Sequence, residues 1–209
     1  MANTPTADPT QVTTGTARLS YVHLTQPFDR KDGTEPRYSV TILVPKRDTA
    51  TKAKIDAAIE HVAQRASAGI WGGRPPIFAT PVHDGDGARP SDGRPFGPEC
   101  RGHWVFAASS KQRPSLVDLS LQDIIDQREI YSGMYGRVNV RFFEYNRSGK
   151  KGVGCGLNHV QKVSDGEALS GRVSVDEAFA EPPQDFILSH AQSISIAADP
   201  PPLTADVFS

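Results

Sequence analysis

Aromatic rings and cations alternate with apolar residues between Tyr135 and Tyr145. A strand places successive side chains on opposite faces, so the even positions Val138, Val140 and Phe142 are expected to share one apolar face. The odd positions then offer rings and positive charge on the other face, a combination that suits a flexible polyanion with unstacked bases. These odd positions are Tyr135, Arg137, Asn139, Arg141, Phe143 and Tyr145.

Cations in two turns extend this candidate nucleic-acid surface. Residues 146–151 are predicted to reverse the chain into a second strand, because small and polar residues are typical of turns. Trp104 is added as a further stacking ring, although Phe106 shares its face and favours burial. The alternative is an ordinary solvated or doubly buried sheet face, since aromatic residues are common in strands. The cations expected to flank the ring-bearing face are Lys111, Arg113, Lys150 and Lys151.

A zinc site is the main competing interpretation. Cys100-x-x-His103 and Cys155-x-x-x-His159 supply four ligands of the kind that zinc prefers. However, Cys155 and His159 fall on a predicted strand, where residues four apart share a face but lie about 13 Å apart, too far for one ion. Both cysteines are therefore expected to be small buried hydrophobic residues. No metal and no other cofactor is predicted.

Catalytic motifs are absent from the sequence. Asp84-Gly-Asp-Gly is similar to the start of a calcium loop, but Pro95 stands where that loop needs a glutamate. No nucleophile elbow, phosphate loop or dinucleotide fingerprint occurs. A nuclease would need clustered carboxylates, and the segment with Asp84, Asp86 and Asp92 is the one candidate. The chain is therefore expected not to be an enzyme.

Composition indicates one β-rich domain with tails. The chain has 209 residues, of which 37% are hydrophobic, and its 18 glycines and 17 prolines favour turns. No apolar run reaches the roughly 18 to 20 residues of a membrane span, and the polar N-terminus differs from a signal peptide. Two cysteines provide no disulfide framework. These features predict a cytoplasmic protein that does not associate with membranes.

Periodicity predicts one helix among several short strands. The helix is expected to begin after the N-cap Asp48 and to end at Gly69, since apolar residues recur at helical spacing between them. Strands are expected near residues 17–24, 37–44, 103–110 and 115–118, in addition to the pair described above. The segment 71–102 is expected to be a binding flap or a partner contact, because structureless loops of this length are uncommon. The fold class is mainly β with one inserted α-helix, either a small five- or six-stranded barrel or a sandwich.

Charge is distributed unevenly along the chain. Residues 172–209 hold one cation and six acids, a net charge of −5, so the remaining residues carry +4 of the total of −1. Residues 1–15 and 172–209 also lack hydrophobic periodicity. We therefore expect a disordered N-terminal arm over 1–15, a folded domain over 16–171 and an acidic flexible tail over 172–209.

Several motifs resemble a phage and prophage family whose members are labelled single-stranded DNA-binding proteins. Tyr131-Ser-Gly-Met-Tyr-Gly-Arg-Val and Gly149-Lys-Lys-Gly-Val-Gly-Cys-Gly-Leu-Asn carry most of this resemblance, which spans about residues 16 to 180. The resemblance implies an oligonucleotide-binding (OB) fold with an inserted helix. It also implies that Tyr131, Tyr135 and Arg137 enter the central strand, and that the glycine-rich strand keeps one face clear for close approach.

The resemblance further implies a sequence-nonspecific single-stranded DNA-binding protein that protects DNA in phage replication or recombination and promotes annealing. The acidic tail would recruit replication or recombination proteins through Asp206 and Phe208, although the aromatic is penultimate here. A homodimer is compatible with this interpretation. The alternative from another class is a phage structural or assembly protein with a β-rich packing module.

Overall fold

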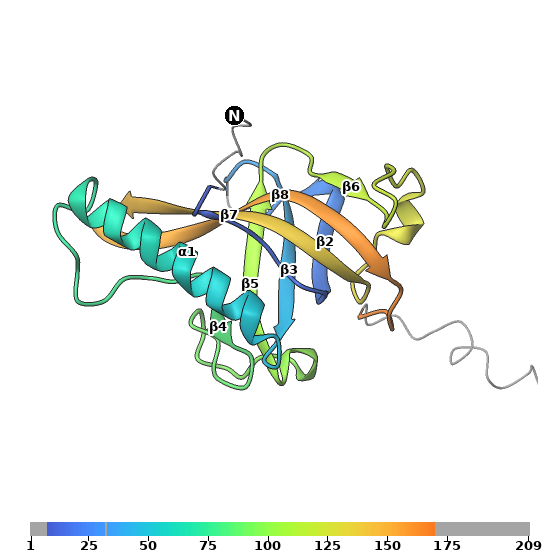
Figure 1. Cartoon of the computed structure of the whole chain (residues 1–209), viewed down its shortest axis with the longest axis horizontal. Coiled ribbons are helices and arrows are strands. Elements are labelled where there is room, and N and C mark those ends of the chain that lie inside the picture. The colour runs from blue at the N-terminus through green and yellow to red at the C-terminus, as the bar shows by residue number, and fades with distance from the viewer. Residues whose placement is uncertain (1–7, 32, 170–209) are drawn as a thin grey trace, which may run out of the picture. The chain divides into compact units, whose positions relative to one another are not determined.

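The computed structural model describes residues 8–31 and 33–169 (Figure 1). The expected acidic tail over 172–209, with Asp206 and Phe208, lies outside these residues. No helix in the described part of the chain is long and apolar enough to cross a membrane.

Five strands form a closed ring. They are β2 (Ala17–Phe28), β3 (Arg37–Pro45), β5 (His103–Ser110), β7 (Tyr135–Arg147) and β8 (Lys150–Ser164). The order around the ring is β7, β2, β3, β5 and β8, and β8 pairs again with β7. The pairing of β5 with β8 is parallel, whereas the other four pairings are antiparallel. This order is that of an OB-like fold and confirms the predicted mainly β class.

A short strand precedes the ring. Strand β1 (Gln11–Thr13) pairs antiparallel with β7, and Gln11 lies opposite Arg141. Thr10 and Thr14 are buried, and the Thr14 hydroxyl accepts a hydrogen bond from the Val138 amide at 3.0 Å. Residues 8–15 therefore differ from the expected disordered arm. The segment is held mainly by backbone pairing and by threonine hydroxyls. A strand held in this way needs no alternation of apolar residues, so the sequence contained no pattern that would have predicted it.

The predicted helix is confirmed as α1 (Thr49–Ala68). The Asp48 carboxylate caps it by accepting a hydrogen bond from the Thr51 amide at 3.0 Å. Ile55 and Val62 on its inner face are fully buried against the ring core, which also holds Phe106 and Phe142. In Figure 1 the helix runs alongside the ring.

Strands β7 and β8 join through a two-residue turn. Ser148 and Gly149 both have positive φ, 49° and 80°, as the tight turns favoured by twisted hairpins require. The turn is therefore shorter than the predicted 146–151. As a consequence, Arg147 and Lys150 belong to the strands and Lys151 has a defined face.

The long segment 71–102 is tied to the ring at two places. Ala79 forms a parallel bridge with Gly152 of β8, and β4 (His83–Asp84) pairs with β5. Segment 71–102 therefore covers part of the outer surface of the ring.

The remaining short elements are β6 (Ser115–Val117), which pairs with β8, and two 3-10 helices, η1 (Pro98–Cys100) and η2 (Gln127–Glu129).

Replacing the helix cap should destabilise the protein measurably. Asp48→Ala removes the acceptor for the Thr51 amide, which is expected to cost about 1 kcal/mol and to lower the melting temperature by about 2–4 °C. Asp56→Ala is the matched control, because Asp56 on the same helix makes only an exposed ion pair with Lys52. Thermal unfolding followed by circular dichroism measures both. Equal melting temperatures for the two variants would contradict the capping role.

Candidate nucleic-acid interface

The alternation of β7 is confirmed by burial. Val138, Val140 and Phe142 are fully buried inside the ring. Arg137 and Arg141 are exposed on the opposite face, and the Phe143 side chain is 44% exposed. The strand therefore presents rings and cations to solvent as its sequence predicted.

The rings of β7 lie over glycines of β8. Phe143 pairs with Gly154 and Tyr145 pairs with Gly152. A Cβ added at Gly154 would be 2.6 Å from the Phe143 ring, and one at Gly152 would be 2.5 Å from the Tyr145 hydroxyl. The glycines therefore do not leave bare backbone, as the sequence had suggested, but make room for rings that lie against the sheet. Rings fixed in this way are preorganised for stacking.

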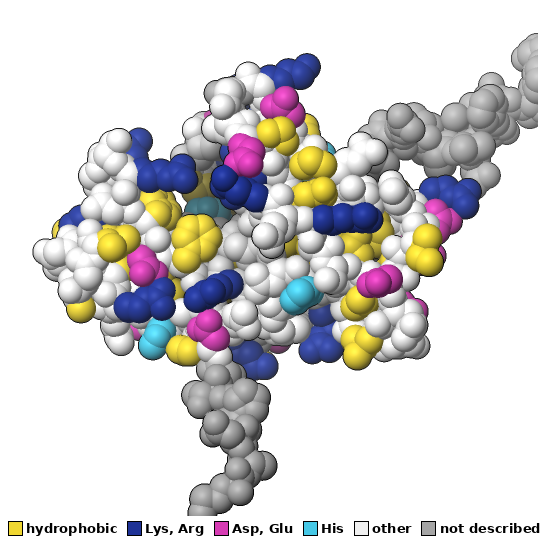
Figure 2. Space-filling model, turned by 90° about the horizontal axis from the view of Figure 1, so that it is seen from above, with side chains coloured by type: hydrophobic (Ala, Val, Ile, Leu, Met, Phe, Trp, Pro, Cys, Tyr) yellow, Lys and Arg dark blue, Asp and Glu magenta, His cyan; other side chains and the backbone are white. Residues whose placement is uncertain are grey.

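Small side chains continue this surface across the neighbouring strands. Residues that pair in a sheet share a face, and the register joins one row across five strands. The row consists of Ser39, Ser109, Gly156, Arg141 and Gln11. The outer surface of β3, β5 and β8 along this row therefore carries no bulky side chain, and a strand of nucleic acid can approach the sheet closely there. Figure 2 shows Lys and Arg side chains spread among hydrophobic, uncharged and acidic ones on the upper face of the molecule.

A cavity of about 400 Å³ continues the same outer surface over β3 and β5. Thr41 and Ala107 form part of its lining, and Tyr21, His83 and Phe96 add rings around them. The OB fold binds oligonucleotides on the strands that correspond to β3 and β5. Sequence reasoning missed these residues. The one local feature that could have pointed to the cavity is Tyr21, an aromatic residue in a strand whose side chain is exposed. Tyr21 is 65% exposed and has a positive φ of 46°, where β2 changes register.

Arg137 and Arg141 of β7 make only long contacts with the protein. Arg137 Nε donates to the Thr14 carbonyl at 3.4 Å, and the Arg141 guanidinium lies 3.6 Å from the Asp8 carboxylate. Exposed contacts of this length contribute little to stability, so both guanidinium groups can turn toward a phosphate.

Lys151 and Trp104 lie away from the outer surface. The Lys151 ammonium donates to the Trp71 carbonyl on the side of β8 that also carries buried Val153. Trp104 pairs with buried Val44 and therefore faces inward, with the Lys46 and Lys52 ammonium groups 5.2 and 4.4 Å from its ring centre. Trp104 is accordingly a packing residue at the end of α1.

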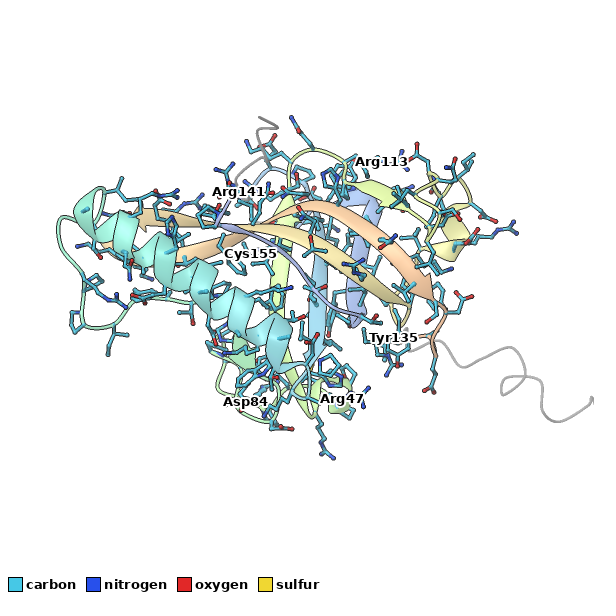
Figure 3. The ribbon with its side chains drawn as sticks, viewed as in Figure 1. Arg47, Asp84, Arg113, Tyr135, Arg141 and Cys155 are labelled. Carbon is cyan, nitrogen blue, oxygen red and sulfur yellow. The ribbon has the colours of Figure 1, made fainter. Side chains whose placement is uncertain are left out.

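The other expected cations are dispersed. Lys111 pairs with Glu35 beside the end of β5, and Arg113 lines a different cavity next to β6. Lys150 is exposed at the hairpin turn. Figure 3 shows Tyr135 and Arg141 far apart along the hairpin, with Arg113 separate from both. The structure thus brings Arg141, Phe143 and Tyr145 together on the outer surface. The other candidate residues lie apart from these three.

Comparison with known proteins places the chain in a family. The family model of the single-stranded DNA-binding protein of Enterobacter phage Enc34 matches residues 10–187. The chain belongs to this family. A putative protein p50 of Acyrthosiphon pisum secondary endosymbiont phage 1 is 29% identical over 167 residues, which cover 74% of this chain and 83% of that protein.

Solved structures agree with this assignment. The single-stranded DNA-binding protein of bacteriophage Enc34 in complex with ssDNA is 28% identical, with a TM-score of 0.66 over 77% of this chain and 90% of that one. The single-stranded DNA-binding protein gp2.5 of bacteriophage T7 is 15% identical, with a TM-score of 0.55 over 84% of this chain and 96% of that one. The second likeness shows a shared fold.

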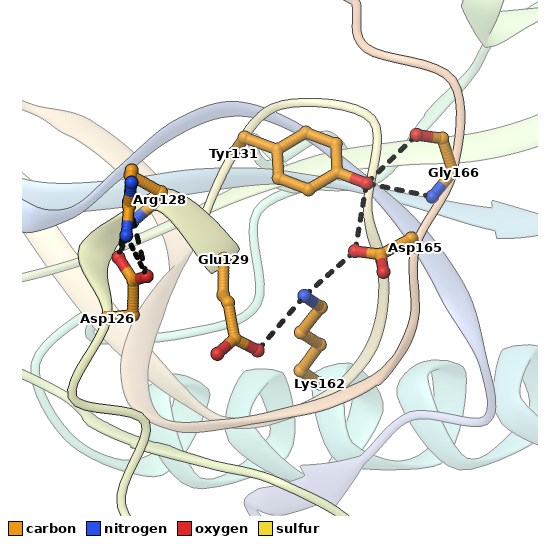
Figure 4. A network of polar contacts seen from close by, with 7 residues as sticks. All are labelled: Asp126, Arg128, Glu129, Tyr131, Lys162, Asp165 and Gly166. Atoms are coloured by element: carbon orange, nitrogen blue, oxygen red, sulfur yellow. Dashed lines mark hydrogen bonds and ion pairs between the residues drawn. The ribbon is translucent and has the colours of Figure 1, made fainter.

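Tyr131, at the entry to β7, has a structural role in this member of the family (Figure 4). Its hydroxyl contacts the Asp165 carboxylate at 3.1 Å and the Gly166 carbonyl and amide at 3.0 Å. Lys162 lies 2.8 Å from Asp165 and 3.4 Å from Glu129, and hydrogen bonding to Lys162 lowers the pKa of Asp165. This network fixes the chain after β8, where Gly166 packs against the Tyr135 ring. Tyr135 is thereby held at the margin of the surface.

The residues considered for zinc do not converge. Cys100 and Cys155 are buried in separate hydrophobic clusters, and burial raises the pKa of the Cys100 thiol to about 11 and that of Cys155 further. An extra residue in β8, between the partners of Asn139 and Val140, turns His159 to the face opposite Cys155. The expectation that Cys155 and His159 share a face is therefore wrong. Within the described residues no three His, Cys, Asp or Glu side chains are grouped so as to hold a metal ion.

The Asp84 segment is a turn closed by a lysine. Lys46 lies 2.5 Å from the Asp84 carboxylate and 2.6 Å from that of Asp86, and hydrogen bonds from Lys46 lower the pKa of both. The Asp86 carboxylate also accepts the Gly102 amide at 2.9 Å. The two carboxylates are thus occupied in holding β3, β4 and the start of β5 together.

Two glycine substitutions should separate ring placement from strand stability. Gly154→Ala introduces a Cβ 2.6 Å from the Phe143 ring, so the half-exposed ring should swing off the sheet at a stability cost below about 1 kcal/mol. Gly156→Ala is the control, since its nearest neighbour would be at an acceptable 3.4 Å. Nuclear Overhauser contacts between the Phe143 ring and β8 should vanish only in Gly154→Ala. Their persistence in that variant would show that the glycine does not position the ring.

Proposed function

We propose that the protein binds single-stranded DNA without regard to sequence, through the surface defined by Arg141, Phe143 and Tyr145 and its continuation over β3, β5 and β8. The observation that carries this proposal is the placement of two rings over glycines next to an exposed arginine. Membership of a family of phage single-stranded DNA-binding proteins supports it.

Binding would combine stacking with charge neutralisation. Unstacked bases would lie on the Phe143 and Tyr145 rings, and each base stacked on an aromatic ring contributes about 1–3 kcal/mol. Arg141 and Arg137 would contact phosphates, a term that depends on salt because counterions are released. Bases in duplex DNA are already stacked on one another, so the rings would favour single strands. Stacking accepts every base, so this mechanism has no sequence preference.

In the cell, the protein would coat exposed strands during phage DNA replication or recombination, in the cytoplasm of the host, and would help complementary strands anneal. The protein would carry out no catalytic step of its own. The acidic tail with Asp206 and Phe208 would contact other replication or recombination proteins, a role supported by its charge and by the resemblance to phage single-stranded DNA-binding proteins.

Removing the Phe143 ring should weaken binding to single strands. Phe143→Ala is expected to lower the affinity for a labelled oligo-dT that holds one molecule by about 5- to 150-fold, which corresponds to one stacked base. Leu119→Ala is a suitable control, because Leu119 is a similarly exposed apolar residue in the segment after β6. Fluorescence anisotropy titration measures both. An unchanged affinity of Phe143→Ala would remove the ring from the binding surface.

Removing the two arginines should change the salt dependence. Arg137→Ala and Arg141→Ala together are expected to reduce the slope of log affinity against log salt by about 1.4, since each phosphate contact to a single strand contributes about 0.7. Arg128→Ala is the matched control, because Arg128 is exposed but paired with Asp126 near β6. Titrations of an oligo-dT that holds one molecule, at several salt concentrations and with a duplex competitor, give the slopes. A double variant with the slope of the unmodified protein would refute the phosphate contacts.

A further inference from the structure

One end of the described domain is basic and carries exposed apolar side chains. Here the basic tip means residues 146–152 of the hairpin together with Ile70 and Ile77. Residues 146–152 hold three cations and no acid, and two of the cations, Arg147 and Lys150, are exposed. Ile77 is 87% exposed and Ile70 is 53% exposed. Both belong to the tip, since Asn146 hydrogen-bonds to the Ile70 carbonyl and Ala79 bridges to Gly152.

The other end is acidic and also carries exposed apolar side chains. The acidic lobe is the segment 118–130, in which four acids and one arginine give a charge of −3. Leu119, Leu121 and Ile125 in this lobe are 64%, 71% and 90% exposed. Isolated exposed apolar residues need no explanation, but three within seven residues form a patch of the kind found at interaction sites.

The acidic lobe is held in a defined conformation. The Asp118 carboxylate accepts hydrogen bonds from the Ser120 and Gln122 amides at 2.8 and 2.9 Å. The Ile124 amide donates to the Leu116 carbonyl of β6 at 2.9 Å. Asp123 is exposed and forms no ion pair within the described part of the chain, and the same holds for Arg147 and Lys150 at the basic tip. Each end therefore presents unpaired charge beside fixed apolar side chains.

The basic tip and the acidic lobe lie at opposite ends of the longest axis of the described domain (Figure 1). Strand β7 alone spans 13 residues, or about 40 Å. The two surfaces therefore cannot meet within one molecule. They match in charge, since Arg147 and Lys150 at one end and Asp123 at the other are exposed and form no ion pair within the described residues, and they match in apolar character. These are the properties of a contact between two copies of the chain.

We propose that the basic tip of one copy docks on the acidic lobe of the next copy along a bound strand. This inference rests on the proposed function, because the direction of the strand decides the symmetry. A DNA strand has a 5′-to-3′ direction, so copies that bind it through the same asymmetric surface all point the same way. Neighbours are then related by a translation and a rotation along the strand, which requires a head-to-tail contact between two different surfaces. The contact makes coating cooperative.

Cooperativity on long strands tests this contact separately from DNA binding. Ile125→Ser should leave the affinity for an oligo-dT that holds one molecule within about twofold, while the affinity for a poly-dT that holds many molecules falls about tenfold, because the apolar contact is lost without a change of charge. Phe28→Ser is the control, since Phe28 is 47% exposed and belongs to neither end. Equal affinities of the unmodified protein for short and long strands would overturn the proposal. Loss of binding to the short strand in the unmodified protein would instead refute the proposed function.

Charge reversal tests the pairing of the two ends. Asp123→Lys and Lys150→Glu should each reduce affinity for poly-dT relative to the short oligonucleotide, because each places like charges against one another. The double variant restores opposite charges and should recover most of the cooperativity. Because the short oligonucleotide reports any direct contribution of Lys150 to DNA binding, the ratio of the two affinities isolates the protein contact. A double variant with no recovery would show that these ends do not meet.

Discussion

The pairing of outward rings on β7 with glycines on β8 is the constraint on which the candidate interface depends. Any side chain at Gly152 or Gly154 would occupy the space where Tyr145 and Phe143 lie. With glycine there, the rings rest on the sheet and lose little conformational freedom on binding, which lowers the entropic cost of stacking a base. The glycines weaken a strand intrinsically, but β8 offsets this by pairing with β7 over nearly its whole length.

The same hairpin connects the interface to the stability of the ring. The inward residues of β7, Val138, Val140 and Phe142, are fully buried, and the ring closes because β8 pairs with β5 as well as with β7. The outward residues of the same strands therefore inherit the rigidity of the core. Sites on packed strands hold their geometry better than sites on loops, and this suits a surface that must bind repeatedly along a strand without rearrangement.

The sequence predicted what depends on local pattern. Period two along β7 assigned its faces correctly, and the Asp48 cap with its apolar spacing located α1. It could not predict features that depend on register between distant strands. His159 faces outward because β8 contains one extra residue, whereas Trp104 shares the inward face of Phe106, as period two along β5 had indicated. The cavity with Tyr21 and Phe96 unites segments far apart in the chain, and no local pattern reports such proximity.

Nonspecific binding follows from what the outer surface lacks as well as from what it carries. Along the row through Ser39, Ser109 and Gly156 the side chains are too short to reach past a phosphate backbone and read the edge of a base. In the proposed binding mode, recognition is left to ring faces, on which every base can stack, and to guanidinium groups, which would contact phosphates. Duplex DNA offers the phosphates but hides the ring faces. Discrimination between single and double strands therefore arises from stacking, whereas charge sets the overall affinity and its dependence on salt.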